Sequence, residues 1–197
     1  MFKKLLAALT GQDAHPGREV YEIRGFQVVV ENSRPDIATA DVLARFDEAL
    51  GLIERYQPWR LRHLRRDLRQ FWIVRYPCRG AYFPGTRTCM TELTFLARRD
   101  ITAAPVASSI LHEGVHARVD CMGVRPASRD AAREERLCRR AELAFGQALP
   151  PELGAPVVER AAASLDLTDE GVAPTIDWAE AARRQEAVDR AAVPPSA

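Results

Sequence analysis

Two histidines and a glutamate stand close together in the segment His112-Glu113-Gly114-Val115-His116, which has the pattern H-E-x-x-H. If this segment is helical, His112 and His116 project from one face, because four residues make slightly more than one turn. Two imidazoles at this spacing can bind one tetrahedral zinc ion, while Glu113 lies beside the metal and not on it. Glu113 can then take a proton from a water molecule that zinc makes acidic and pass it to a leaving amine. The motif therefore predicts a zinc-dependent hydrolase with Glu113 as general base and then general acid.

A catalytic zinc site needs a third protein ligand. The other two histidines, His15 and His63, lie upstream in an irregular segment and a basic helix, so a downstream carboxylate is the better candidate. No histidine follows His116, whereas Glu135 comes after 18 intervening residues and lies in a second predicted helix, 128–149. A glutamate on an antiparallel helix could reach the same ion, so we predict Glu135 as the third ligand. A helical wheel instead centres Glu134 on the apolar face and leaves Glu135 at its border. Glu134 therefore stays an alternative ligand, and Glu142 a weaker one.

The residues His112, Glu113, His116 and Glu135 together resemble the zincin metallopeptidases, specifically the gluzincin type with a glutamate ligand on a later helix. The resemblance covers about residues 102–145. It implies an α+β, zincin-like fold, in which a small sheet packs on the active-site helix and further helices follow. It also implies a zinc cofactor and a peptide or protein substrate, which would pair in extended form with an edge strand.

Peptide hydrolysis also needs a hydrogen-bond donor for the oxyanion that develops on the substrate. All four tyrosines precede the motif, so the sequence offers no tyrosine after it for this task. We predict Arg139, one turn beyond Glu135, as the donor and Tyr82 as the second choice. Ser109 and Asp120 lie on the metal side of the motif helix and could orient an imidazole. Helix capping or solvent exposure is the alternative for both.

The pattern of apolar residues predicts the elements that position these side chains. Gly25 indicates a hairpin turn between the first two strands, and the strand at 88–96 is the expected edge strand for a substrate. We expect one domain at 1–150, followed by an acidic helical extension at 151–197 with a frayed tail. Strands are predicted at 19–23, 26–30, 71–74 and 88–96, and helices at 38–56, 61–68, 102–119, 128–149, 156–165 and 176–192.

The composition is that of an ordinary folded protein. The chain has 197 residues, of which 47% are apolar and 28% are charged, and these fractions exclude a disordered or fibrous chain. No run approaches the roughly 20 apolar residues that cross a bilayer. The apolar run at 5–9 is too short for a secretory signal, so we expect a surface-anchoring first turn at 1–10 and a cytoplasmic protein. The four cysteines are expected to be reduced, although Cys78 and Cys89 flank a predicted hairpin and leave one bridge open.

Charge is unevenly distributed along a chain whose formal net charge is only +1. Residues 54–79 carry eight arginines and two acids among aromatic side chains, whereas 151–197 carry nine acids and four arginines. The basic segment suits a single-stranded nucleic acid, but neutralisation within the chain is the commoner arrangement. Two rival functions stay open: a catalytically silent binding protein that zinc stabilises, and a regulatory module whose arginine-rich surface binds nucleic acid or protein. The sequence indicates no oligomeric state.

Overall fold

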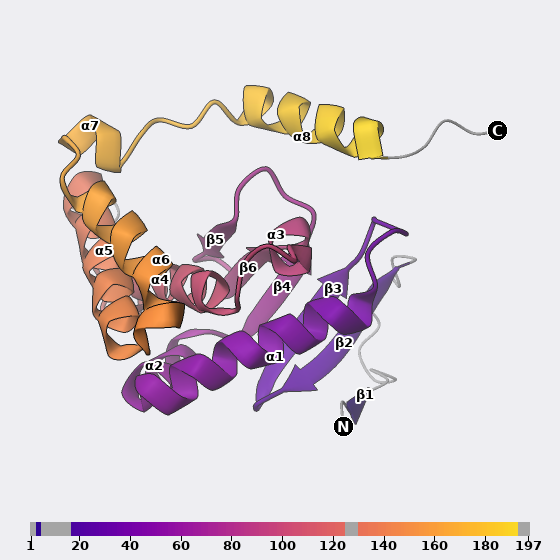
Figure 1. The fold of residues 1–197 in the computed structure, drawn as a ribbon, viewed down its shortest axis with the longest axis horizontal. Helices are drawn as coiled ribbons and strands as arrows, with labels where there is room; N and C mark the ends of the chain where they lie inside the picture. The colour runs from indigo at the N-terminus through magenta and orange to yellow at the C-terminus, as the bar shows by residue number, and fades with distance from the viewer. Residues whose placement is uncertain (1–2, 5–16, 125–129, 193–197) are drawn as a thin grey trace.

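Three parallel strands form the centre of a six-stranded sheet in the computed structural model, which describes residues 3–4, 17–124 and 130–192. The strand order is β1-β2-β3-β4-β6-β5 (Figure 1). β3 pairs with β4 and β4 with β6 in parallel, and the other neighbours are antiparallel. The strands are β1 (Lys3–Lys4), β2 (Arg18–Ile23), β3 (Phe26–Glu31), β4 (Gln70–Val74), β5 (Gly80–Phe83) and β6 (Thr88–Glu92).

Helices cover the sheet and continue beyond it in the C-terminal half (Figure 1). Together with the sheet they confirm the predicted α+β class. The helices are α1 (Thr39–Tyr56), α2 (Pro58–Asp67), α3 (Leu93–Ala97), α4 (Ala104–Cys121), α5 (Ala131–Ala148), α6 (Pro151–Leu165), α7 (Asp169–Val172) and α8 (Trp178–Ala192).

The predicted hairpin joins β2 to β3 through a tight turn. Arg24 and Gly25 have φ angles of 47° and 76°, the left-handed conformation that a two-residue turn requires and that glycine adopts without steric cost. The guanidinium of Arg24 is tied to α1, because it donates hydrogen bonds to Asp47 (2.7 Å) and Glu54 (2.6 Å). These contacts hold the turn against the helix.

The core lies between the sheet and the helices α1 and α2, which connect the parallel strands β3 and β4. Val42, Phe46, Leu50 and Ile53 follow one another at three- and four-residue spacing on α1 and are fully buried. The ring of Phe46 meets that of Phe71 on β4 edge to face, with 5.0 Å between ring centroids. The apolar residues whose spacing predicted this helix are thus the ones that pack it against the sheet.

The prediction of a long edge strand at 88–96 is wrong in two respects. β6 ends at Glu92, whose carboxylate accepts a hydrogen bond from the Phe95 amide (2.7 Å) and so caps α3. β6 also lies between β4 and β5, so β5 is the edge strand. Every residue of β6 is buried, as expected of a strand covered on both faces, whereas β5 is half-buried.

The C-terminal helices extend from the core. α6 packs along α5, and its residues Val157 and Ala161 are buried. α8 lies near the ends of the central strands in Figure 1, where the Asp189 carboxylate pairs with Arg34 (2.7 Å) and Arg75 (3.0 Å). The Arg75–Asp189 pair joins the basic segment to the acidic one. The boundary predicted at residue 150 stays a prediction.

Two predictions, the frayed C-terminal tail and the surface-anchoring first turn, concern residues that lie largely outside the described ranges. The terminal tail lies beyond the described residues, as does the first turn except for β1.

All four cysteines are free, so the structure contains no bridge between Cys78 and Cys89. Among the described helices none has the length and apolar character needed to cross a membrane.

Candidate metal centre

α4 carries the H-E-x-x-H motif and has a core face opposite its histidines. Val106, Ile110 and Ala117 belong to the buried core. Gly114, inside the motif, lies where α4 meets α2, because a Cβ atom there would come within 2.5 Å of Leu64 Cδ2. Glycine therefore lets α2 approach the motif helix closely.

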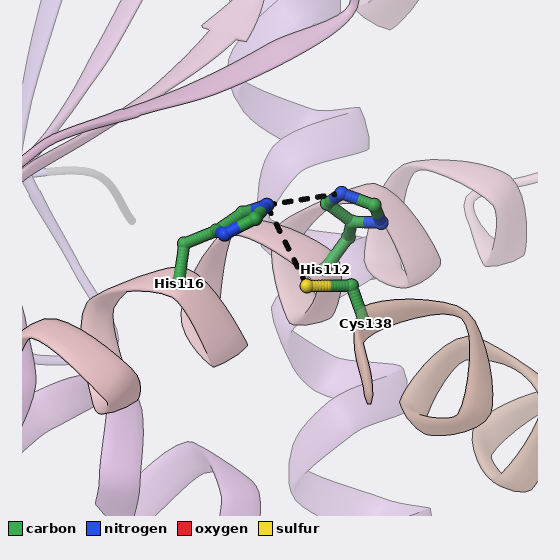
Figure 2. A group of neighbouring side chains, drawn as sticks. All are labelled: His112, His116 and Cys138. Carbon is green, nitrogen blue, oxygen red and sulfur yellow. Dashed lines mark hydrogen bonds between the residues drawn. The ribbon is translucent and has the colours of Figure 1, made fainter. Parts of the chain in front are cut away.

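The two histidines of the motif converge, as Figure 2 shows. The Nε2 atoms of His112 and His116 lie 3.3 Å apart. Glu135 reaches both of them from α5, with Oε2 3.2 Å from His112 Nε2 and Oε1 3.3 Å from His116 Nε2. The structure thus brings together the three residues predicted as metal ligands.

These separations suit a tetrahedral zinc ion. Zinc binds nitrogen and carboxylate oxygen at about 2.0–2.1 Å, which places neighbouring ligand atoms about 3.3 Å apart. Two imidazoles and one glutamate carboxylate are also a ligand set that occurs in catalytic zinc sites. The chemistry of the donor set and its spacing therefore both fit this metal.

A second layer of carboxylates fixes both imidazole rings. Glu142 Oε1 accepts a hydrogen bond from His112 Nδ1 (2.6 Å), and Glu134 Oε1 accepts one from His116 Nδ1 (2.7 Å). Ser108 in turn donates to Glu142 Oε2 (2.9 Å). The alternative ligands Glu134 and Glu142 thus contact the Nδ1 atoms, and the Nε2 atoms face Glu135.

The two histidines and the surrounding glutamates shift one another's pKa values. Burial by itself lowers the pKa of His112, but hydrogen bonds to Glu135 and Glu142 raise it to about 9. The pKa of His116 is also raised, again against the effect of burial. Burial would raise the pKa of Glu135, yet its hydrogen bonds with both histidines hold it far below its usual range. The neighbouring carboxylates therefore favour the protonated form of both imidazoles.

Glu113, the predicted general base, lies beside the histidines and under the edge strand. Its side chain is buried, and this burial raises the pKa of its carboxyl group despite the two neighbouring histidines. A Cβ atom added at Gly80 of β5 would lie 3.1 Å from Glu113 Oε1 and 2.9 Å from Ser109 Oγ. The backbone of β5 therefore passes directly over the carboxylate.

Cys138 is a member of the centre that sequence reasoning missed. Its buried Sγ lies 3.5 Å from His116 Nε2, as drawn in Figure 2. Cys138 forms with His112 and His116 a group whose potential ligand atoms all lie within 4.8 Å of one another. It stands three residues after Glu135, so the helical spacing that places both on one face was the available signal.

The auxiliary residues occupy different places. Arg139 lines the same cleft as the histidines, and its Nη1 donates to Glu142 Oε1 (2.7 Å). Tyr82 donates its hydroxyl proton to Asp120 (3.0 Å). Ser109 and Asp120 were predicted to orient an imidazole. Ser109 lines the cleft. The Nδ1 atoms of His112 and His116, however, contact Glu142 and Glu134.

A cleft of about 720 Å³ opens over the centre. Its walls come from β5, α4, α5, α6 and the segment around α7 and α8. They include Gly80 and Ala81 of the edge strand, Arg160 of α6 and Trp178 at the start of α8. The size suits a peptide segment or another ligand of comparable volume.

The fold and the site together define an α+β protein with a candidate metal centre. Comparison of the chain with protein-family models, with curated proteins and with solved structures finds no match.

Proposed function

We propose that the protein is a zinc-dependent hydrolase, and specifically a peptidase. The observation that carries the proposal is the convergence of His112 Nε2, His116 Nε2 and the Glu135 carboxylate, with Glu113 alongside, on one open cleft. A bound zinc ion would supply Lewis acidity, which makes a neighbouring water more acidic and a peptide carbonyl more electrophilic.

The side chains around the cleft would bind the metal and orient its ligands. His112, His116 and Glu135 would hold the metal, and Glu142 and Glu134 orient the two imidazoles. Their hydrogen bonds keep both Nε2 atoms directed at one point.

Glu113 would accept a proton from water and later donate it to the leaving amine. Its place beside both histidines and in the cleft wall supports this role. Arg139 is the proposed oxyanion donor, supported by its place in the cleft wall.

The edge strand β5 favours an extended peptide as the substrate. β5 pairs with β6 on one side, and in the described part of the chain no strand pairs with its other side. Gly80 and Ala81 line the cleft, so a peptide that added to this edge would run past Glu113.

The test is metal-dependent hydrolysis of an unstructured protein substrate. Zinc is removed with a chelator and then restored stoichiometrically, for the wild type and for His116→Ala. The proposal expects about one zinc per chain, activity that zinc restores, and loss of both in the folded variant. A His15→Ala control changes a histidine outside the motif. Full zinc occupancy in folded His116→Ala, or no hydrolysis of a broad peptide library by the zinc-loaded wild type, would refute it.

One observation favours a second candidate, a structural zinc site in a binding protein. A zinc–sulfur bond of about 2.3 Å places sulfur about 3.5 Å from a nitrogen on the same ion, which is the spacing between Cys138 Sγ and His116 Nε2. Four protein ligands would close the site. Cobalt substitution separates the candidates, because a thiolate ligand gives an intense charge-transfer absorption in the near ultraviolet that Cys138→Ser would remove. The peptidase proposal expects no such absorption.

A further inference from the structure

The cleft contains a positively charged wall beside the metal centre. Arg139 and Arg160 both line it, and the two guanidinium groups repel each other electrostatically. Arg139 extends from α5 and Arg160 from α6, and both are partly buried. Burial of like charges is costly unless an anion compensates it.

The acidic group that interacts with Arg160 is Glu142, but the oxygens of this carboxylate are already engaged. Oε1 accepts from His112 Nδ1 (2.6 Å) and from Arg139 Nη1 (2.7 Å), and Oε2 accepts from Ser108 (2.9 Å). The single negative charge of Glu142 is therefore shared between His112, Arg139 and Arg160.

The guanidinium of Arg160 on the same wall has N–H donors without a protein acceptor in the described part of the chain. Within the described residues, Arg160 makes neither an ion pair nor a side-chain hydrogen bond, whereas Arg139 donates to Glu142 through Nη1 (2.7 Å). A guanidinium presents several N–H groups that match a carboxylate. The guanidinium of Arg160, which lines the cleft, is thus a donor group of the kind that binds the two oxygens of a carboxylate.

We infer that Arg160 binds a carboxylate of the ligand that occupies this cleft. The inference rests on the proposed peptidase function and gives its substrate class: peptides that bring a negative charge next to the metal centre. The charge could come from a free C-terminal carboxylate or from an aspartate or glutamate side chain, since both present the same group.

Binding of matched peptides distinguishes these sources without relying on turnover. The zinc-loaded Glu113→Gln protein is titrated calorimetrically with N-acetyl-trialanine as the free acid and as the amide, and with amidated N-acetyl-Ala-Glu-Ala and N-acetyl-Ala-Gln-Ala. At least one acid should bind about tenfold or more tightly than its neutral partner, as expected of a charge-assisted hydrogen bond. The pair that shows the difference identifies the source of the carboxylate.

Two further variants in the same background assign that preference to its residue. Arg160→Met should abolish the preference for the acid and leave the affinity for the neutral peptide nearly unchanged, while Arg160→Lys should retain part of it. Arg62→Met, an exposed arginine of α2, makes the same charge change away from the cleft and should leave the preference intact. Zinc content and melting temperature are measured for each variant.

Equal affinity for acid and neutral peptides in both pairs overturns the inference, and so does a preference that survives in folded, zinc-loaded Arg160→Met. These results are separate from a failure of the proposed function, which is measured as absence of hydrolysis by the wild type. Hydrolysis without a carboxylate preference refutes only the inference. A carboxylate preference without hydrolysis supports the subsite and refutes the peptidase.

Discussion

His112 Nδ1 lies 2.6 Å from Glu142 Oε1, and this contact connects the candidate metal ligand to the interior of the helical layer. Glu142 is only 1% exposed, and Ser108 and Arg139 hold its carboxylate in place. A metal-binding imidazole needs such a partner to fix its orientation and to keep the opposite nitrogen free. In the proposed metal centre Glu142 is therefore a positioning residue, although its type and spacing also suggested a ligand.

The role of Glu142 predicts an intermediate effect on zinc affinity. Glu142→Gln keeps the size of the side chain but removes its charge, so we expect zinc affinity to fall by about 10- to 100-fold without loss of the fold. Chelator competition measures the affinity, and exposed Glu159→Gln on α6 is the matched control. An unchanged affinity would show that the contact does not position the imidazole.

The two adjacent glutamates of α5 should differ in their effects. Glu135→Gln is expected to weaken zinc binding more than Glu134→Gln, because the Glu135 oxygens face both Nε2 atoms and Glu134 contacts only Nδ1 of His116. The same chelator competition compares the two variants at equal protein concentration. A larger loss in Glu134→Gln would assign the ligand to that residue.

The raised pKa of His112 predicts a steep pH dependence of zinc binding. With a pKa of about 9 in the metal-free protein, His112 is protonated at neutral pH, and zinc has to displace that proton. Affinity should therefore rise with pH by about tenfold or more per unit throughout about pH 6 to 8. The competition assay is corrected for protonation of the chelator. A plateau above about pH 6.5, the ordinary pKa of histidine, would contradict the coupling.

The sequence was sufficient to predict the α+β class, the first hairpin and the motif helix, because each depends on local pattern. The periodicity of α1 and the turn at Gly25 are examples, since both signals lie within a few residues of the structure they specify. The prediction of Glu135 depended on spacing along a second helix, and the structure places this side chain at both Nε2 atoms.

Features that depend on tertiary arrangement could not be derived in the same way. Which strand forms the edge is decided by the order of β6 and β5 in the sheet, and neither sequence segment specifies its neighbours. The approach of Cys138 to His116 depends on how α5 is rotated against α4. The spacing of Cys138 from Glu135 puts both on one face of α5, but such a face includes core residues and metal neighbours alike.

The most direct test of the central claim is the Glu113→Gln variant, examined for zinc content and for hydrolysis of an unstructured protein substrate. Glutamine keeps the size of the side chain but cannot take a proton from water, so zinc occupancy and melting temperature should stay close to wild type. The turnover number should fall by at least about 100-fold, the usual contribution of a positioned acid–base group. Wild-type turnover in a variant that retains its zinc would contradict the assignment of Glu113 as the general base.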